Sequence, residues 1–309
     1  MSPNFEASSL FSVKGMVAVV TGGGTGIGLT MAQALASNGA QKVYILGRRL
    51  EVLKTAAASS NPSILVPIQC DVTSKDSLQA AVDQITRETG FVNLLVANSG
   101  VLGSPNSYGK PGTVANVSEL RKALFEEHSM EQFTDALHVN VTGAFFTMTA
   151  FLELLDAGNK NALKGGFGAP LNEEHAKAGA PGIQSQVIVT SSIAAYSKSP
   201  MSTPSYASSK AAVMHLTKTA AGNLARFGIR ANALAPGLFP SELAGGMIGS
   251  RTPETESVDD PRYIPVRRFG TEEEMAGTLL YLASRAGAYC NGSAIVMDGG
   301  RLAVMPASY

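Results

Sequence analysis

Seven short apolar runs, separated by longer stretches of helical character, constrain the fold of this chain more than any other feature. The runs predict buried strands: Met16–Val20, Lys42–Leu46, Ile64–Ile68, Val92–Ala97, Gln186–Thr190, Arg230–Leu234 and Ala294–Met297. The intervening stretches include helical segments long enough to cross between parallel strands, for instance Gly28–Ser37, Lys75–Glu88, Met130–Leu155, Tyr206–Ala225 and Glu272–Ser284. This alternation predicts an α/β fold, a doubly wound parallel sheet of seven strands with helices on both faces.

The chain is expected to form a single domain over residues 1–309, because neither a repeat nor a break in composition divides it. With 45% hydrophobic residues, it can bury a substantial core. Two stretches rich in Gly, Pro, Asn and Ser predict inserted surface loops, one at 101–117 and the other at 158–182. A third long connection, 239–265, follows the end of a strand, and we expect it to form a lid.

Charge and composition argue against several classes of partner. The formal net charge is zero, which provides no long-range attraction to nucleic acid or to anionic lipid. The sequence contains neither a secretion signal nor an apolar stretch long enough to span a membrane, so a cytoplasmic protein is expected. Cys70 and Cys290 match no metal-binding or redox spacing, and we expect packed thiols and no metal site.

Glycines cluster in the run T-G-G-G-T-G-I-G at 21–28, between the first strand and the first helix. Glycines at this point let the backbone turn tightly and approach a pyrophosphate at the helix N-terminus. The position predicts a Rossmann-like dinucleotide site that includes Gly22, Thr25, Gly26, Ile27 and Gly28. The other interpretation is a glycine-rich turn without a ligand.

The second predicted strand ends in Leu46-Gly47-Arg48-Arg49. A site for NAD would be expected to carry a carboxylate here for the ribose hydroxyls, and none is present. A guanidinium at Arg48 or Arg49 can instead pair with a 2′-phosphate, so the sequence favours NADP(H). The alternative is that both arginines are solvated charges at the start of a helix.

Tyr206 and Lys210 lie four positions apart at the start of a predicted helix, which places both side chains on one face. An ammonium about 5 Å from a phenol, at an effective dielectric of 20, favours the phenolate by about 3 kcal/mol, or roughly two pKa units. Ser192 follows the strand Gln186–Thr190, at the end of the sheet where open α/β folds bind ligands. The spacing of Tyr206 and Lys210 alone is weak evidence, since such pairs also arise by chance on helix surfaces.

Seven segments together resemble the motifs of the short-chain dehydrogenase/reductase family, in the order that the family has them. They span nearly the whole chain: Thr21–Gly28, Asn98–Gly100, Val139–Val141, Ser191-Ser192, Tyr206–Lys210, Pro236-Gly237 and Asp298–Gly300. The resemblance implies an oxidoreductase, similar to 3-oxoacyl-carrier-protein reductase-like and polyketide-modifying ketoreductases.

The resemblance also implies roles for the reacting residues. Tyr206 is expected to be the general acid–base, Ser192 to position the substrate carbonyl, and Lys210 to bind the nicotinamide ribose while lowering the pKa of Tyr206. Asn140 would complete the set by holding a water that links Lys210 to solvent. Its other interpretation is a buried helix asparagine that satisfies backbone groups.

The same comparison extends the expected cofactor site. The additional residues are Asp71, Val72, Asn98, Gly100, Pro236, Gly237 and Ser241. Asp71 resembles the aspartate that meets the adenine ring, but it is equally suited to cap a helix. The hydroxyl of Ser241 is expected to reach the nicotinamide carboxamide.

Two departures from the family pattern bear on the site. The spacing from Ser192 to Tyr206 is one residue longer than the commonest one, which leaves Ser191 as an alternative. The segment Ala97–Gly100 reads A-N-S-G where the family has N-N-A-G, although the asparagine and the glycine are kept.

The sequence therefore predicts an NADP(H)-dependent enzyme that transfers a hydride between nicotinamide and a ketone or secondary alcohol, in the direction of reduction. The substrate is expected to be a hydrophobic or polyketide/3-oxoacyl-like small-molecule carbonyl, covered by the 239–265 lid. The family resemblance implies a homodimer or homotetramer. The alternatives are an NAD-dependent secondary alcohol dehydrogenase, a nucleotide-sensing scaffold, and a non-redox use of the same pocket.

Overall fold

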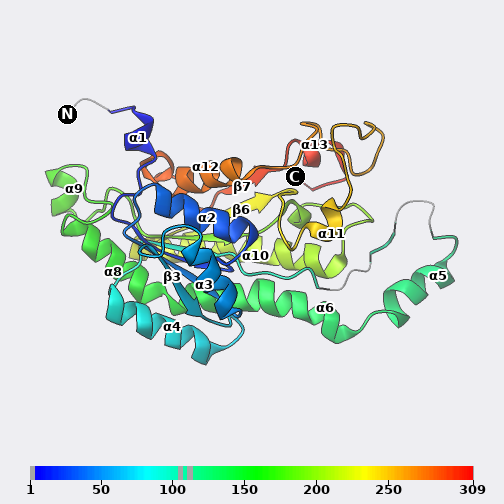
Figure 1. Ribbon diagram of the computed structural model, residues 1–309, viewed down its shortest axis with the longest axis horizontal. Helices are drawn as coiled ribbons and strands as arrows, with labels where there is room; N and C mark the ends of the chain where they lie inside the picture. Colours follow the sequence, from blue (N-terminus) through cyan, green and yellow to red (C-terminus); the bar gives the residue numbers. More distant parts are fainter. Residues whose placement is uncertain (1–3, 104–106, 110–113, 309) are drawn as a thin grey trace.

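A parallel sheet of seven strands forms the centre of the computed structural model, which describes residues 4–103, 107–109 and 114–308 (Figure 1). The spatial order of the strands is β3-β2-β1-β4-β5-β6-β7, and every neighbouring pair is parallel. The strands are β1 Val17–Thr21, β2 Lys42–Gly47, β3 Leu65–Gln69, β4 Leu94–Ala97, β5 Gln186–Thr190, β6 Arg230–Pro236 and β7 Ala294–Met297. The prediction of a doubly wound parallel sheet is confirmed, and each predicted run contains or overlaps a strand.

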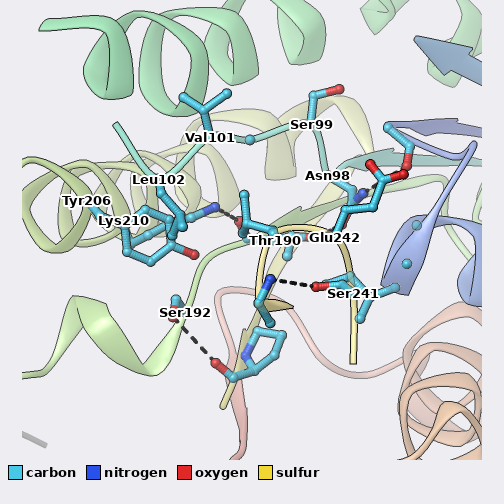
Figure 2. A pocket seen from close by; sticks show the side chains of 18 of the residues that line it. Asn98, Ser99, Val101, Leu102, Thr190, Ser192, Tyr206, Lys210, Ser241 and Glu242 are labelled. Carbon is cyan, nitrogen blue, oxygen red and sulfur yellow. Dashed lines mark hydrogen bonds between the residues drawn. The ribbon is translucent and has the colours of Figure 1, made fainter. Parts of the chain in front are cut away.

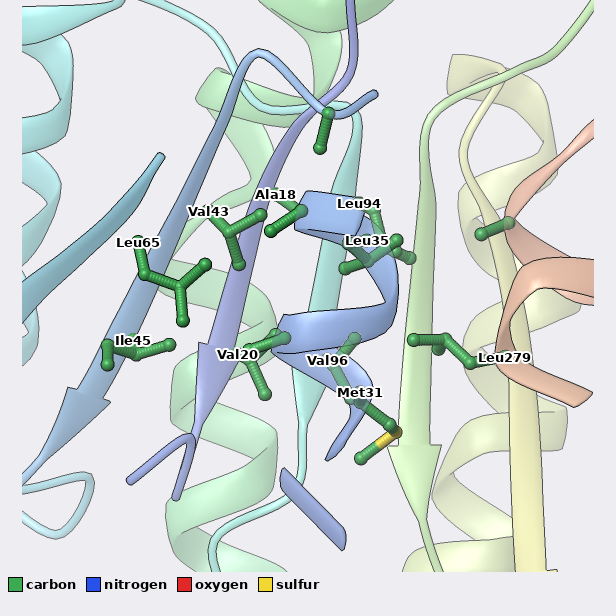
Figure 3. Close-up of a cluster of buried hydrophobic side chains, with 14 of the residues drawn as sticks. Ala18, Val20, Met31, Leu35, Val43, Ile45, Leu65, Leu94, Val96 and Leu279 are labelled. Atoms are coloured by element: carbon green, nitrogen blue, oxygen red, sulfur yellow. The ribbon is translucent and has the colours of Figure 1, made fainter. Parts of the chain in front are cut away.

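The two faces of the sheet are buried by different helices, which explains why the strands are apolar without a polar face. Alternate residues of β1, Ala18 and Val20, belong to a cluster that includes residues of α2 (Gly26–Ser37), α3 (Leu50–Ala58) and α12 (Glu272–Ala283), seen in Figure 3. Val17 and Val19 point the other way, toward α4, α7, α8 and α10. All five residues of β1 are buried as a result.

The remaining helices lie mostly where the alternation predicts crossovers. They are α1 Ala7–Leu10, α4 Lys75–Glu88, α5 Val117–Arg121, α6 Met130–Leu137, α7 Ala144–Ala150, α8 Leu152–Leu163, α9 Glu173–Lys177, α10 Pro204–Leu224, α11 Gly245–Ile248 and α13 Arg301–Val304. Within the described ranges, none combines the length and the apolar character that a membrane crossing requires.

The predicted helix Met130–Leu155 is interrupted. Between α6 and α7 the chain forms a wider π-helical turn, His138–Gly143, and α7 ends at Ala150, with Phe151 separating it from α8. Gly143 packs closely on another segment here, since a Cβ added to it would lie 3.0 Å from the side chain of Val72. The π turn therefore brings the backbone around Asn140 close to the end of the sheet, an arrangement often found at functional sites.

The prediction of an inserted loop at 158–182 is wrong at its start, because residues 158–163 complete α8, and Glu173–Lys177 forms the short helix α9. Gly158 and Asn159 have loop-like composition, but both are buried against the sheet. The Asn159 amide donates to the carbonyl of Gly228 (2.8 Å) and accepts from the backbone N–H of Ser185 (2.8 Å). The other predicted loop, 101–117, lies partly outside the described residues, and α5 begins at Val117.

The 239–265 segment is anchored near both ends and crosses the top of the sheet between them. At its start, the Phe239 ring fills the space beside Gly270, where an added Cβ would lie 2.4 Å from the ring. Near its end, the Arg301 guanidinium donates to the carbonyls of Pro261 (2.9 Å) and Tyr263 (2.8 Å). These contacts hold the segment near both of its ends, and the residues between them lie next to the carboxyl ends of the strands.

A substitution at Gly158 tests the packing of α8. A Cβ at this position would lie 2.2 Å from the carbonyl oxygen of Val92 and 2.6 Å from the Ser185 hydroxyl. Gly158→Ala should lower the free energy of unfolding by about 1–3 kcal/mol through overpacking, as measured by urea denaturation. Gly222→Ala in α10, where an added Cβ would meet no described atom within 4 Å beyond the adjacent turns of its own helix, is the matched control and should be neutral or stabilising by up to about 1 kcal/mol. An unchanged urea midpoint for Gly158→Ala would contradict this packing.

Candidate active site

A cavity of about 1210 Å³ opens at the carboxyl ends of the strands, where the strand order reverses between β1 and β4. It is large enough for a dinucleotide together with a small substrate. All the predicted site residues line it except Asn140. One half of the cavity lies beside the turns that follow β1 and β2, and we call it the nucleotide half. The other half follows β5 and β6 and contains Ser192 and Tyr206 (Figure 2).

In the glycine-rich turn after β1, the backbone conformation and packing leave no room for side chains at several glycines. Gly22 and Gly26 have φ values of +65° and +52°, in the left-handed region that favours glycine. A Cβ on Gly28 would lie only 2.2 Å from the carbonyl oxygen of Gly22. Thr25, at the N-cap of α2, makes no side-chain hydrogen bond to the first turn, so the amides there are not capped by it. The turn thus fits the close approach of a pyrophosphate.

Asn98 ties the ends of three strands together. Its amide nitrogen donates to the carbonyl of Thr21 at the end of β1 (3.1 Å), and its amide oxygen accepts from the Thr190 hydroxyl at the end of β5 (3.0 Å). The Thr21 hydroxyl in turn accepts from the backbone N–H of Asn98 and of Ser99. The structure therefore shows Asn98 in a scaffolding role that the sequence did not suggest.

The two arginines after β2 have different environments. The Arg49 guanidinium forms an ion pair with Glu242 of the 239–265 segment, with 2.7 Å between Nη2 and Oε2. Arg48 also lines the cavity, but its guanidinium forms no hydrogen bond or ion pair with any residue that the structure describes. Arg48 is thus the arginine available for an anionic ligand.

Asp71 does not cap a helix, so that alternative is wrong. Its Oδ1 accepts from the backbone N–H (2.9 Å) and the hydroxyl (2.7 Å) of Thr73, and these bonds, with the nearby charge of Arg48, lower the pKa of Asp71. Ser74 caps α4 instead, accepting from the backbone N–H of Ser77. Asp71 therefore remains ionised on the cavity wall.

Ser192 and Tyr206 meet in the other half of the cavity. The Ser192 hydroxyl accepts from the backbone N–H of Ala194 (3.1 Å) and donates to the carbonyl of Pro236 (3.4 Å), which fixes it at the end of β5. Burial raises the pKa of Tyr206 to about 12, although a hydrogen bond with Ser192 acts in the opposite direction. Ser191 is buried and donates to the carbonyl of Lys210 (2.8 Å), so it is Ser192 that meets the phenol.

Lys210 lies beneath the tyrosine and is only 4% exposed. Its Nζ donates to the carbonyl of Thr190 (2.8 Å) and lies 5.5 Å from the centre of the Tyr206 ring. Burial lowers the pKa of Lys210 to about 8. Desolvation of the phenol dominates here and holds the pKa of Tyr206 above its ordinary value; that Lys210 lowers this pKa stays a prediction.

The side-chain amide of Asn140, in the π turn, forms hydrogen bonds with Val101 and Ser209. Its Oδ1 accepts from the backbone N–H of Val101 (2.8 Å), and its Nδ2 donates to the Val101 carbonyl (2.9 Å) and to the Ser209 hydroxyl (2.9 Å). These are the contacts of a buried asparagine that satisfies backbone groups. Asn140 nevertheless lies near Lys210, since a Cβ on Gly100 would be 3.1 Å from its Oδ1 and 3.4 Å from the lysine Nζ.

Several residues that line the cavity beyond Tyr206 were not found from the sequence. They are mostly apolar or positively charged: Leu102, Met201, Met305, Arg251, Arg262 and Arg301. Arg301 begins α13, and the others come from loops around the site, whose conformations leave no periodic signal. The apolar side chains of Leu238, Leu243 and Met247 also line it.

A curated relative shows which family this constellation belongs to. The short-chain dehydrogenase/reductase SAT3 of Stachybotrys chartarum is 59% identical over 279 residues, which cover 90% of this chain and 100% of the relative. This chain belongs to the short-chain dehydrogenase/reductase family. The family model described as short chain dehydrogenase matches residues 16–163, and the one described as enoyl-(acyl carrier protein) reductase matches residues 171–301.

More distant members of the family are similar over nearly the whole chain. The 3-oxoacyl-[acyl-carrier-protein] reductase MabA of Mycobacterium bovis is 27% identical, with 91% of each chain covered. A structure of a gluconate 5-dehydrogenase from Burkholderia cenocepacia, in complex with NADP and tartrate, superposes with a TM-score of 0.75 at 25% identity, covering 96% of this chain and 99% of that one. As a member of the short-chain dehydrogenase/reductase family, the protein is an oxidoreductase that uses a nicotinamide cofactor.

Burial of the Lys210 ammonium should make the stability of this dehydrogenase/reductase depend on pH. The pKa of Lys210 is about 8 in the folded protein, below its ordinary value of 10.5. Burial of the charged ammonium therefore destabilises the folded state. This desolvation cost is present in full below pH 8 and disappears as the pH rises to 10.5. Lys210→Met removes this penalty. The stability of the variant relative to wild type should therefore fall by about 2 kcal/mol between pH 7 and pH 9.5 in urea denaturation. The exposed Lys218→Met is the control, and an equal pH dependence for both variants would refute the burial of a charged Lys210.

Proposed function

We propose that this protein is an NADP(H)-dependent ketoreductase in which Ser192, Tyr206 and Lys210 carry the reaction. The observation that supports this most strongly is their convergence on one wall of the cavity whose other half begins at the glycine-rich turn. When bound, the nicotinamide supplies the hydride that reduces a ketone, or accepts one from a secondary alcohol. The chain's own residues have to bind the cofactor, orient the carbonyl and deliver a proton.

Tyr206 is suited to be the proton donor for reduction. With a pKa of about 12, its phenol holds its proton at neutral pH and can give it to the alkoxide oxygen that develops on the substrate. The hydroxyl of Ser192, which meets the phenol, orients the same carbonyl oxygen. Lys210, with a pKa of about 8, is mostly protonated at pH 7, and its positive charge beneath the ring stabilises the phenolate that remains.

The preference for NADP(H) rests on Arg48. Its guanidinium lines the nucleotide half and forms no ion pair with the part of the chain that the structure describes, and β2 ends without the carboxylate that would bind free ribose hydroxyls. A 2′-phosphate would give this arginine a charged partner in a geometry that a planar guanidinium matches well. The structural neighbour that holds NADP is consistent with this assignment.

Other residues around the cavity complete the proposed cofactor site. In addition to the glycine-rich turn, Arg48 and Arg49, we assign to it Asp71, Val72, Asn98, Gly100, Pro236, Gly237, Ser241 and the reacting residues Tyr206 and Lys210. Asn140 is assigned a positioning role behind Lys210, because it contacts the backbone of Val101 next to Gly100.

The substrate is proposed to be a hydrophobic or 3-oxoacyl-like carbonyl compound. Apolar side chains from four segments line the substrate half, among them Leu102, Met201, Leu243 and Met305. The relative named 3-oxoacyl-[acyl-carrier-protein] reductase favours the same class. The 239–265 segment, which crosses the cavity, would then act as the lid that excludes water.

We also propose that this single domain forms a homodimer or homotetramer through the helices that hold Asn140 and Tyr206. Phe133 on α6 and Phe145 on α7 expose 37% and 39% of their surface. Exposed aromatic side chains on these helices are suited to burial between two copies of the chain.

Removal of the Tyr206 hydroxyl tests the mechanism. Tyr206→Phe should reduce NADPH-dependent turnover of a panel of 3-oxoacyl esters and cyclic ketones by about 10²–10⁴-fold, because the proton donor is lost. Its dissociation constant for NADPH should stay within about twofold of wild type, because the substitution keeps the ring of Tyr206 and leaves the glycine-rich turn and Arg48 unchanged. Tyr289→Phe, at a fully exposed tyrosine, is the control and should retain activity. A Tyr206→Phe variant that keeps wild-type turnover would exclude this mechanism.

A further inference from the structure

The 239–265 segment reaches across the mouth of the cavity and touches the nucleotide half at two adjacent residues. Ser241 packs on the glycine-rich turn, since a Cβ added to Gly26 would lie 2.8 Å from the Cβ of Ser241. The next residue, Glu242, forms the 2.7 Å ion pair with Arg49. Figure 2 shows Ser241 and Glu242 on the same side of the cavity, away from Tyr206.

The ion pair is built so that it can be broken at low cost. Both side chains are 61% exposed, and exposed ion pairs of this kind contribute little to stability. The segment does not depend on it for its fold, because Phe239 beside Gly270 and Arg301 on the Pro261 and Tyr263 carbonyls anchor the segment on either side. Glu242 and Arg49 can therefore separate without unfolding the lid.

Arg49 is also one residue from Arg48, the guanidinium proposed to receive the cofactor's 2′-phosphate. A phosphate monoester carries a charge of about −1.5 to −2 at neutral pH, compared with −1 for a carboxylate. A 2′-phosphate held at Arg48 would therefore compete directly with Glu242 for the Arg49 guanidinium. A cofactor that lacks this phosphate would leave the ion pair intact.

We propose that Glu242 determines how strongly the protein discriminates between NADP(H) and NAD(H), by competing with the 2′-phosphate for Arg49. Binding of NADP(H) exchanges the Arg49–Glu242 pair for an Arg49–phosphate pair, which frees Glu242, while the contact of Ser241 with the glycine-rich turn remains. Binding of NAD(H) leaves the Arg49–Glu242 pair intact. This inference rests on the proposed NADP(H) site.

A double-mutant cycle tests the competition. The dissociation constants of NADPH and NADH are measured by calorimetry for the wild type, Glu242→Gln, Arg49→Gln and the double variant. Glu242→Gln should tighten NADPH binding by about three- to tenfold through the freed Arg49, and should change NADH binding by less than about twofold. In the Arg49→Gln background, the same glutamate substitution should have no effect on NADPH.

A matched control uses the ion pair of Glu51 and Lys54 on α3, which is also exposed (2.8 Å) and whose two residues do not line the cavity. Glu51→Gln removes one negative charge nearby and should leave both cofactors unaffected. The fold of each variant is checked by its thermal unfolding.

The outcomes separate this inference from the function on which it rests. Tight NADPH binding by the wild type, with no effect of Glu242→Gln, would overturn the competition alone. So would an equal tightening in the Arg49→Gln background, which would indicate a through-space charge effect, or an equal change for NADPH and NADH. Failure of the wild type to bind NADPH would overturn the proposed function, and this inference with it.

Discussion

A continuous line of hydrogen bonds across the ends of three strands positions everything else in the site. It runs from Thr21, at the start of the glycine-rich turn, through Asn98 to Thr190, whose carbonyl accepts from Nζ of Lys210. Each member is buried or partly buried, so the bonds form where water competes weakly for them. These hydrogen bonds connect the nucleotide half to the half that contains Tyr206. The distance between the two halves is therefore set by the strands of the sheet.

Burial disfavours the charged forms of both Tyr206 and Lys210. Desolvation favours the neutral phenol of Tyr206 and the neutral amine of Lys210, and α10, which carries both residues, packs on the sheet through Val213 and Ala220. The neutral phenol is the form that donates a proton during reduction. Burial therefore prepares the acid, and Lys210 becomes important for the phenolate that follows.

Local patterns allowed the strands, the glycine-rich turn and the spacing of Tyr206 and Lys210 to be predicted, because each depends on neighbours in the sequence. The π turn at Asn140 and the helical start of the 158–182 stretch could not be predicted, since they depend on packing against distant backbone, as with Gly158 on Val92. The pairing of Arg49 with Glu242 joins residues 193 positions apart. The raised pKa of Tyr206 could not be predicted, because the sequence shows the nearby ammonium and not the extent of burial.

The proposed function and the role of Glu242 both depend on the assignment of the nucleotide half to NADP(H). Calorimetric titration of the wild-type protein with NADPH and NADH, side by side at one salt concentration, tests it most directly. We expect NADPH binding with a dissociation constant in the micromolar range and NADH binding at least about tenfold weaker, a difference of about 1.4 kcal/mol. Equal affinities would contradict the role given to Arg48, and the absence of binding by either nucleotide would contradict the function as a whole.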